Sequence, residues 1–218
     1  MSKALFRASL AEFVGTCFLV MVVIGSGIMA QGLSADQLSV LLANTIATGV
    51  GLTALIWIFI AISGAHFNPV VSLVMYLKKE IDTKQLFSFI IFQCAGGLFG
   101  VVLAHAMFGL DILQISTNDR GGFNIYLSEV VATFGLLVTI LGVRKLHLLA
   151  VAPAVGLYIS AGYWFTSSTS FANPAVTIAR GFSDSFTGIH PDFIMAFIVA
   201  QLVGAILAML FMAFLQEE

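Results

Sequence analysis

Six stretches of the sequence are long and apolar enough to cross a lipid bilayer. A membrane-spanning helix needs about 20 predominantly apolar residues, because the hydrocarbon core is about 30 Å thick. The chain is 60% hydrophobic and only 9% charged, whereas about 25% of the residues of a soluble domain are charged. We therefore expect an all-α membrane protein. Its six spans are expected near residues 8–30, 38–62, 85–108, 126–143, 148–166 and 192–215.

The same composition argues against several classes of function. The formal net charge is −2 and no basic patch is present, so nothing indicates binding to nucleic acid. Cys17 and Cys94 lie far apart within apolar runs, and they predict neither a disulfide framework nor a metal site. The four histidines are scattered, and no arrangement of residues is typical of catalysis. We expect no enzymatic activity, no cofactor and no bound metal.

The basic residues indicate how the chain is oriented. Most Lys and Arg residues precede the first span or lie between spans two and three or spans four and five, while only Arg120 and Arg180 lie on the other side. Because cytoplasmic loops are enriched in Lys and Arg, both termini are expected in the cytoplasm.

Two further apolar segments, 68–77 and 174–182, are too short to cross the membrane, and each begins at an Asn-Pro pair. Proline is tolerated in the first turn of a helix, and asparagine is a favoured N-cap residue. Non-helical backbone at membrane depth occurs only inside protein or along a watery cavity. The pairs therefore predict two half-helices capped by Asn68 and Asn173.

The two halves of the chain resemble each other. The segment "AEFVGTCFLV" in the first span is similar to "SEVVATFGLLV" in the fourth, which pairs Glu12 with Glu129. The segment "FQCAGGLFG" in the third span is similar to "AQLVGAILA" in the sixth, which pairs Gln93 with Gln201. This pattern predicts an internal repeat.

Each half, about 1–112 and 120–218, contains three predicted spans and one half-helix. Because three is odd, the halves should lie in opposite orientations, as in many transport proteins. We expect one membrane channel domain over 1–218 in which the half-helices meet near the midplane. Two facing N-termini, each with about half a positive charge, repel cations. Amides and carbonyls remain for an uncharged solute, which indicates a pore for small neutral molecules.

These segments resemble the aquaporin, or major intrinsic protein, family. The sequences "SGAHFNPVVSL" and "SFANPAVTIAR" are similar to its two Asn-Pro-Ala boxes, and "LAEFVGT" is similar to its first-span signature. The resemblance covers essentially the whole chain and implies one pore in each subunit of a homotetramer, surrounded by lipid of a bacterial inner membrane. The boxes are Asn68, Pro69 and Val70, and Asn173, Pro174 and Ala175. Val70 replaces the usual Ala, which is expected to shift the Asn amides slightly without closing the pore.

The resemblance also implies a second, outer constriction formed by four side chains. Three of them are Thr48 in the second span, Ser170 in the second loop and Val176 directly after the second box. The fourth lies in the fifth span, at Tyr163 if "GLYISAGY" is the anchor or at Ala161 if residues are counted back without a gap. Water channels carry Phe at the Thr48 position and glycerol channels carry Trp, and the family usually carries Arg at the Val176 position.

This filter should be wider and less polar than that of a water channel, and it should admit glycerol, urea and neutral metalloids such as arsenious acid. The run "YWFTSSTSFANPAVTIAR" is similar to bacterial aquaglyceroporins associated with arsenic-resistance operons. Arg180 lies one helical turn after Val176. Either it reaches the outer vestibule and replaces part of the missing charge, or it neutralises the C-terminal end of the half-helix.

Buried polar residues complete the expected site. A carboxylate inside a span is functional by default, but the family's equivalents of Glu12 and Glu129 brace the re-entrant loops, and we expect that role here. Gln93 and Gln201 are expected to form hydrogen bonds between helices. Backbone carbonyls are expected to line the pore at Gly64, Ala65, His66, Thr169 and Phe171.

Three alternatives stay open at this point. The channel is selective for water, or the protein is a proton-coupled secondary transporter that uses Glu12 or Glu129, because inverted repeats and broken helices also occur in transporters. The third alternative is a structural membrane protein whose pore is occluded.

Overall fold

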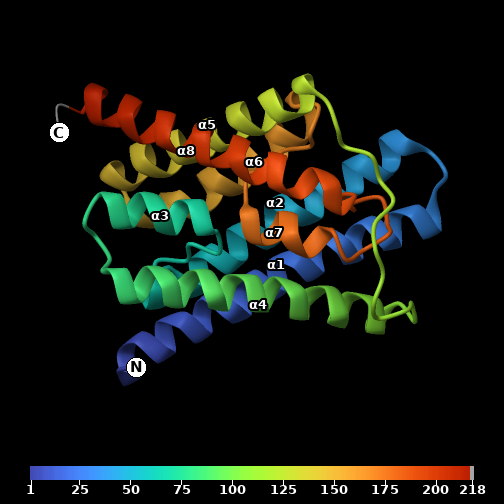
Figure 1. Ribbon diagram of the computed structural model, residues 1–218, viewed down its shortest axis with the longest axis horizontal. Helices are drawn as coiled ribbons and strands as arrows, with labels where there is room; N and C mark the ends of the chain where they lie inside the picture. Colours follow the sequence, from blue (N-terminus) through green and yellow to red (C-terminus); the bar gives the residue numbers. More distant parts are fainter. Residues whose placement is uncertain (217–218) are drawn as a thin grey trace.

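The computed structural model describes residues 1–216, and the regular structure in this range is entirely helical (Figure 1). Six helices are long and apolar enough to cross a membrane, as predicted. A short 3-10 turn, η1 (Leu148–Ala150) or η2 (Pro191–Phe193), leads into each of the last two. The long helices are α1 (Lys3–Leu33), α2 (Gln37–Ser63), α4 (Thr83–Met107), α5 (Phe123–Leu146), α6 (Val151–Phe165) and α8 (Ile194–Leu215).

Two short helices, α3 (Pro69–Leu77) and α7 (Pro174–Arg180), lie among the long helices (Figure 1). Each begins with proline, whose missing N–H is not needed in the first turn. The side chain of Asn68 accepts a hydrogen bond from the backbone N–H of Val70, and that of Asn173 accepts from Ala175 and Val176. The predicted half-helices are therefore present, and the second ends two residues earlier than expected.

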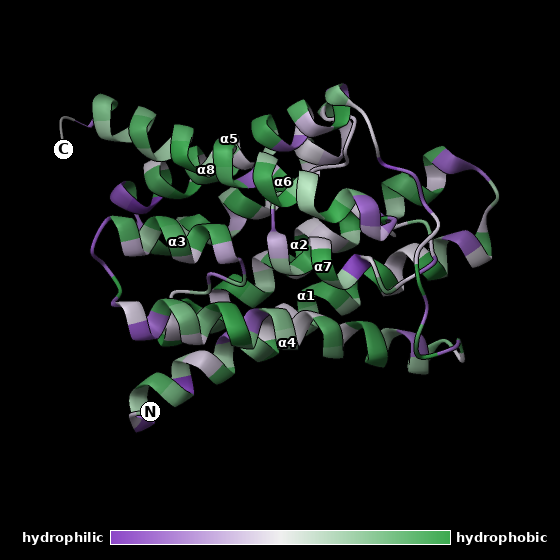
Figure 2. Ribbon diagram, viewed as in Figure 1, coloured by the Kyte–Doolittle hydropathy of each residue, from purple (hydrophilic) through white to green (hydrophobic). Residues whose placement is uncertain are grey.

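The surface of the helix bundle is apolar along the sides of the long helices and polar at the two ends. Hydrophobic residues predominate along the long helices, and hydrophilic residues gather at the two ends and in the loops (Figure 2). Large exposed side chains such as Trp57, Phe87 and Leu157 lie on these helices. A surface of this kind is stable in contact with lipid and not with water.

Glycines allow the closest contacts between helices. A Cβ atom on Gly96 of α4 would clash with the backbone oxygen of Phe13 in α1, and one on Gly204 of α8 would clash with the backbone oxygen of Val130 in α5. Small residues let helix backbones approach in this way in membrane proteins. The two contacts join equivalent helices of the two halves.

Substituting Gly96 with alanine is expected to lower the free energy of unfolding by about 1–3 kcal/mol, because the added methyl group meets backbone that cannot rotate away. Gly32→Ala is the matched control, since a Cβ atom there meets nothing within 4 Å. That variant should be neutral or up to about 1 kcal/mol more stable. Thermal unfolding of the purified variants in detergent measures both, and equal stability of the two would contradict the close α1–α4 contact.

Candidate functional site

One cavity of about 290 Å³ is lined by both half-helices, both preceding loops and helices α1, α2, α5 and α6. Its lining extends from Thr48, Tyr163 and Arg180 at one end to Glu80 and Arg144 at the other. Glu80 and Arg144 belong to the loops predicted to be cytoplasmic, so the end that they line is the predicted inner mouth. The end lined by Thr48, Tyr163 and Arg180 is the predicted outer mouth.

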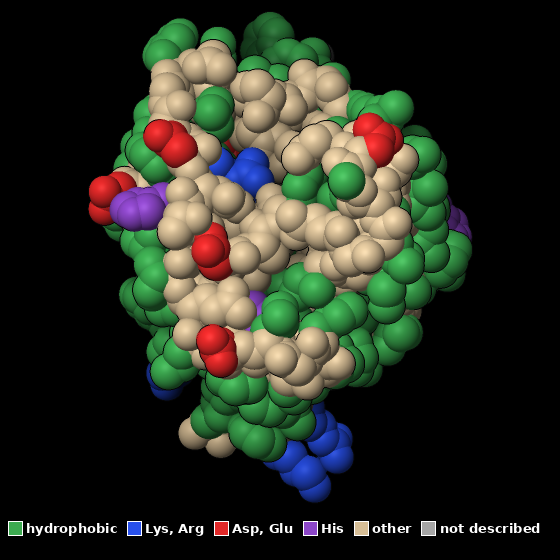
Figure 3. Space-filling view, turned by 90° about the vertical axis from the view of Figure 1, so that its right-hand side faces the viewer, with side chains coloured by type: hydrophobic (Ala, Val, Ile, Leu, Met, Phe, Trp, Pro, Cys, Tyr) green, Lys and Arg blue, Asp and Glu red, His purple; other side chains and the backbone are tan. Residues whose placement is uncertain are grey.

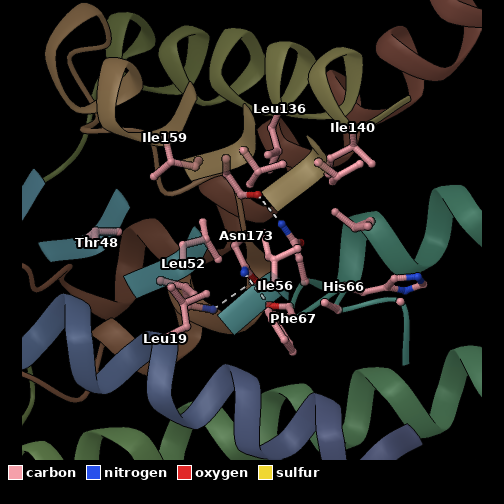
Figure 4. A pocket seen from close by; sticks show the side chains of 18 of the residues that line it. Leu19, Thr48, Leu52, Ile56, His66, Phe67, Leu136, Ile140, Ile159 and Asn173 are labelled. Atoms are coloured by element: carbon pink, nitrogen blue, oxygen red, sulfur yellow. Dashed lines mark hydrogen bonds between the residues drawn. The ribbon is translucent and has the colours of Figure 1, made fainter. Parts of the chain in front are cut away.

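The two asparagines join the half-helix tips inside this cavity. Asn68 Nδ2 donates to the backbone oxygen of Ala172 at 2.7 Å, and Asn173 Nδ2 donates to the backbone oxygen of Phe67 at 2.8 Å. Figure 4 shows Asn173 directed toward the Phe67 segment. Each amide nitrogen carries two hydrogens, so one hydrogen of each asparagine is left for a solute.

The loops that precede the half-helices have an unusual backbone. Five non-glycine residues in these two loops have positive φ values, a conformation that costs on the order of 1–3 kcal/mol each. They occupy equivalent places before the two asparagines. Four of the five predicted carbonyl positions, Gly64, Ala65, His66 and Phe171, line the cavity, but Thr169 does not. The residues with positive φ are Ala65, Phe67, Thr169, Ser170 and Ala172.

Glu12 holds the first loop in this conformation. Its carboxylate accepts hydrogen bonds from the backbone N–H groups of His66 at 2.9 Å and Phe67 at 2.6 Å. It also accepts from Ser63 Oγ at 2.6 Å and from Gln93 Nε2 at 2.8 Å. Glu12 is fully buried and does not line the cavity.

Glu129 makes the equivalent contacts with the second loop. Its carboxylate accepts from the backbone N–H groups of Phe171 and Ala172, both at 2.9 Å, and from Gln201 Nε2 at 2.7 Å. Gln201 also donates to Thr177 Oγ1 in α7, just as Gln93 donates to Ser72 Oγ in α3. Glu129 is also fully buried outside the cavity lining.

The predicted filter residues lie together. Thr48, Tyr163, Ser170 and Val176 all line the cavity, and Thr48 Oγ1 lies 3.1 Å from the Tyr163 hydroxyl. Ala161, the alternative in the fifth span, is exposed and does not line the cavity. Within residues 1–216, the buried Ser170 Oγ has no hydrogen-bond partner.

Arg180 lines the cavity, at the predicted outer mouth, although it is only 3% exposed. Its Nε donates to the backbone oxygen of Thr187, and its guanidinium carbon lies 3.3 Å from the centroid of the Phe171 ring. No hydrogen bond joins its terminal nitrogens to another residue of the 1–216 range. Both predicted environments of Arg180 are thus present, since it contacts a loop carbonyl and it reaches the cavity.

Arg120 is a neighbour that the sequence did not identify as part of the site. It donates to the backbone oxygens of Gly188 at 2.7 Å, Ser168 at 3.3 Å and Phe186 at 3.2 Å. Its guanidinium lies 5.0 Å from the Phe171 ring, and burial lowers the pKa of Arg120 to about 10. Figure 3 faces this end of the molecule and shows basic side chains recessed in a hollow.

An ion pair lies at the predicted inner mouth. Arg144 donates from both terminal nitrogens to the Glu80 carboxylate, at 2.7 Å and 2.6 Å, and one of the two nitrogens also lies 3.1 Å from the Met75 sulfur. The hydrogen bonds from Arg144 hold the pKa of the Glu80 carboxyl below its usual range. No sequence signal pairs these residues, because Glu80 lies in the turn after α3 and Arg144 in the last turn of α5, 64 residues apart.

Apolar side chains form most of the remaining wall. Leu52 and Ile56 of α2, Leu136 of α5 and Ile159 of α6 surround the asparagine region (Figure 4). The sequence did not single them out, since an apolar residue in a span gives no sign of which face it occupies. A solute in this cavity therefore meets its polar partners mainly on the loops and at the filter.

Comparisons with known proteins complete the description. The model of the family described as "Major intrinsic protein" matches residues 1–146. The chain is 49% identical over 213 residues to aquaglyceroporin AqpS of Rhizobium meliloti (strain 1021), covering 98% of this chain and 91% of that protein. It is 31% identical to aquaporin C of Dictyostelium discoideum, covering 97% and 81%. The X-ray structure of the aquaglyceroporin from Plasmodium falciparum has a similar fold, with a TM-score of 0.78, 22% identity and 95% of each chain covered.

Proposed function

Because the chain belongs to the major intrinsic protein family and is an integral membrane channel for water and small solutes such as glycerol, we propose that it also passes urea and neutral metalloids such as arsenious acid. The family resemblance found in the sequence is thereby confirmed. The observation that carries the proposal is the lining of the outer cavity by Thr48 and Val176. A small hydroxyl side chain and an aliphatic one take up less of the cavity than the aromatic and guanidinium groups usual at these positions.

The polar groups of the outer cavity suit a neutral hydroxylated solute. The paired hydroxyls of Thr48 and Tyr163 and the unpartnered hydroxyl of Ser170 can each donate or accept a hydrogen bond. Farther in, Asn68 and Asn173 offer one amide hydrogen each. This spacing of partners supports passage of a solute that exchanges one set of hydrogen bonds for the next.

Exclusion of cations follows from the half-helices. Their N-termini meet at the cross-bonded asparagines, and each N-terminus carries about half a positive charge. Arg180 and Arg120 add positive charge at the outer end, and neither forms an ion pair with a carboxylate within residues 1–216. A cation would therefore be repelled along much of the pore.

The buried carboxylates support a channel over a proton-coupled carrier. Glu12 and Glu129 each accept hydrogen bonds from two loop N–H groups and one glutamine, and neither lines the cavity. We assign both a structural role, with Gln93 and Gln201 as their partners. The same repeated contacts support one channel domain over residues 1–218 with two inverted halves, about 1–112 and 120–218.

The assembly and location extend this proposal. We place the protein in a bacterial inner membrane with both termini in the cytoplasm, where the basic residues of the inner loops would lie. We further propose a homotetramer with one pore in each subunit. The family forms channels, and no enzymatic activity is proposed.

Solute flux into sealed proteoliposomes without an ion gradient tests this function. A channel passes glycerol, urea and arsenious acid at rates that rise linearly with concentration and do not respond to a pH difference. Saturation together with a response to the pH difference would indicate the carrier. Rapid water flux with exclusion of all three solutes would indicate a water-selective channel, and no flux above that of empty vesicles would indicate an occluded pore.

Arg180→Ala is expected to change the glycerol-to-urea permeability ratio by about tenfold. Hydrogen bonds to charged groups contribute about 1.5–3 kcal/mol, and about 1.4 kcal/mol is a factor of ten. Arg7→Ala is the matched control, because Arg7 is exposed near the start of α1. Stopped-flow light scattering measures the ratio. If it is unchanged in Arg180→Ala, the side chain only neutralises the end of α7.

A further inference from the structure

Arg120 and Arg180 place two cations beside one aromatic ring near the predicted outer mouth. Their guanidinium carbons lie 5.0 Å and 3.3 Å from the centroid of the Phe171 ring. Within residues 1–216, neither arginine forms an ion pair with a carboxylate. Two like charges that are close together and largely removed from water repel each other, and a buried charge without compensation is costly. The pair therefore favours the binding of an anion.

The buried carboxylate of Glu129 compensates only one of these two charges. Burial lowers the pKa of Arg120 to about 10, and the attraction of Glu129 offsets part of that effect. The carboxylate is already occupied behind the second loop, where it accepts hydrogen bonds from two loop N–H groups and from Gln201. Arg120, Arg180 and Glu129 together thus leave one positive charge, which a monovalent anion would balance.

Arg180 lines the cavity and has unused hydrogen-bond donors. Its Nε donates to the backbone oxygen of Thr187, whereas its two terminal nitrogens form no hydrogen bond within residues 1–216. These nitrogens carry four hydrogens, although the residue is only 3% exposed. A planar fork of free N–H groups binds a carboxylate-type oxyanion through two parallel hydrogen bonds. Arg180 therefore supplies both the charge and the donor geometry of an oxyanion site.

The rest of the outer cavity adds a donor and no carboxylate. Thr48 Oγ1 lies 3.1 Å from the Tyr163 hydroxyl. One of these hydroxyls donates to the other, so the pair keeps one hydrogen for a bound molecule. Within residues 1–216, the carboxylate that lines the cavity is that of Glu80, which is paired with Arg144 at the predicted inner mouth. Figure 3 shows acidic side chains spread over the surface of the outer face, where salt screens their charge.

We propose that the predicted outer mouth holds a binding site for a small monovalent oxyanion of the carboxylate type. The terminal nitrogens of Arg180 bind the anion, and the hydroxyl pair of Thr48 and Tyr163 offers a further donor. Arg120 contributes its charge while its nitrogens stay bonded to loop carbonyls. Because Thr48, Tyr163 and Arg180 line the same end of the cavity, a bound anion obstructs neutral solutes. The anion is therefore an inhibitor of the channel, and this consequence rests on the proposed function.

Thermal unfolding of the purified protein in detergent tests the site without relying on transport. The probe is sodium formate at neutral pH, and sodium chloride at the same ionic strength is the comparison. One bidentate contact gives a weak affinity, and we expect half-saturation on the order of 10 mM formate. A ligand that binds only the folded protein stabilises it. At about 100 mM formate, the unfolding temperature should therefore be about 3–6 °C higher than in chloride.

Variants at the two ends of the cavity locate the site. Arg180→Gln removes the fork and its charge and should abolish the difference between formate and chloride. Arg180→Lys keeps the charge without the planar fork and should also lose most of it, which decides the question if Arg180→Gln does not fold. Arg144→Gln alters the cavity arginine at the opposite end and should respond as the parent does. Equal effects of the two salts on the parent overturn the proposal, as does a formate response that persists in the Arg180 variants or disappears in Arg144→Gln.

Glycerol flux into proteoliposomes tests the consequence for transport. Formate is present at the same concentration and pH on both sides, so no ion gradient arises. About 10 mM formate should lower the glycerol flux of the parent about twofold relative to chloride, and Arg180→Gln should lose this inhibition. Formate that stabilises the protein without slowing glycerol overturns the inhibitory role. A parent that passes no glycerol in either salt contradicts the channel function itself, while the unfolding measurement still decides whether the anion site exists.

Discussion

Replacing Glu129 with alanine is expected to lower the free energy of unfolding by about 3 kcal/mol or more. The change leaves the N–H groups of Phe171 and Ala172 and one hydrogen of Gln201 without an acceptor, and each unsatisfied buried group costs about 1–3 kcal/mol. Since a folded protein is typically stable by about 5–15 kcal/mol, little folded channel should remain. Thermal unfolding in detergent and the yield of folded protein from the membrane measure the effect.

The controls for this variant use the same chemical change at other places. Glu12→Ala should be as severe, because Glu12 makes the equivalent contacts in the first loop. Glu80→Ala removes an ion pair whose carboxylate is 40% exposed, and such pairs contribute about 0–1 kcal/mol. A stable Glu129→Ala protein that has lost only a pH-dependent flux would contradict the structural role and favour proton coupling.

Val176→Arg is expected to reduce glycerol and urea permeability by about tenfold or more while water still passes. The long side chain would enter the space between Thr48, Tyr163 and Ser170 and bring a further positive charge close to Arg180. A tenfold reduction corresponds to about 1.4 kcal/mol added to the barrier. Stopped-flow shrinking and re-swelling of proteoliposomes with each solute measures the change.

Val176→Thr is the matched control, since threonine has nearly the same shape as valine and adds only a hydroxyl. Its permeability to glycerol and urea should stay within about twofold of the parent, a much smaller change than the reduction of about tenfold expected for Val176→Arg. Water flux through Val176→Arg shows that the variant has folded. If that variant passes larger solutes as the parent does, the assignment of Val176 to the filter is wrong.

The sequence predicted most of the fold because the bilayer imposes local rules. A span must be apolar over about 20 residues, so the long apolar runs in the sequence located the six long helices. The Asn-Pro pairs located both half-helices, because a cap and a first-turn proline act within a few residues of each other. The pairing of Glu12 with Glu129 followed from similar neighbours in the two halves.

The details of the site needed the tertiary structure. The sequence left Tyr163 and Ala161 as alternatives, and the contact between Tyr163 and Thr48 distinguishes them because it depends on how α6 is rotated against α2. The sequence also placed Thr169 in the pore lining, from which the structure excludes it. The direction of a residue in an irregular loop with positive φ values cannot be inferred from its place along the chain.

The sequence by itself determined that this chain spans a membrane six times and that two capped half-helices lie inside the bundle, because hydrophobicity and capping act over short distances along the chain. Only the tertiary structure decided which side chains share the cavity. Thr48 with Tyr163, Glu80 with Arg144 and Arg120 with Phe171 are contacts between distant segments. Their geometry depends on loop paths and helix rotations that no local pattern encodes.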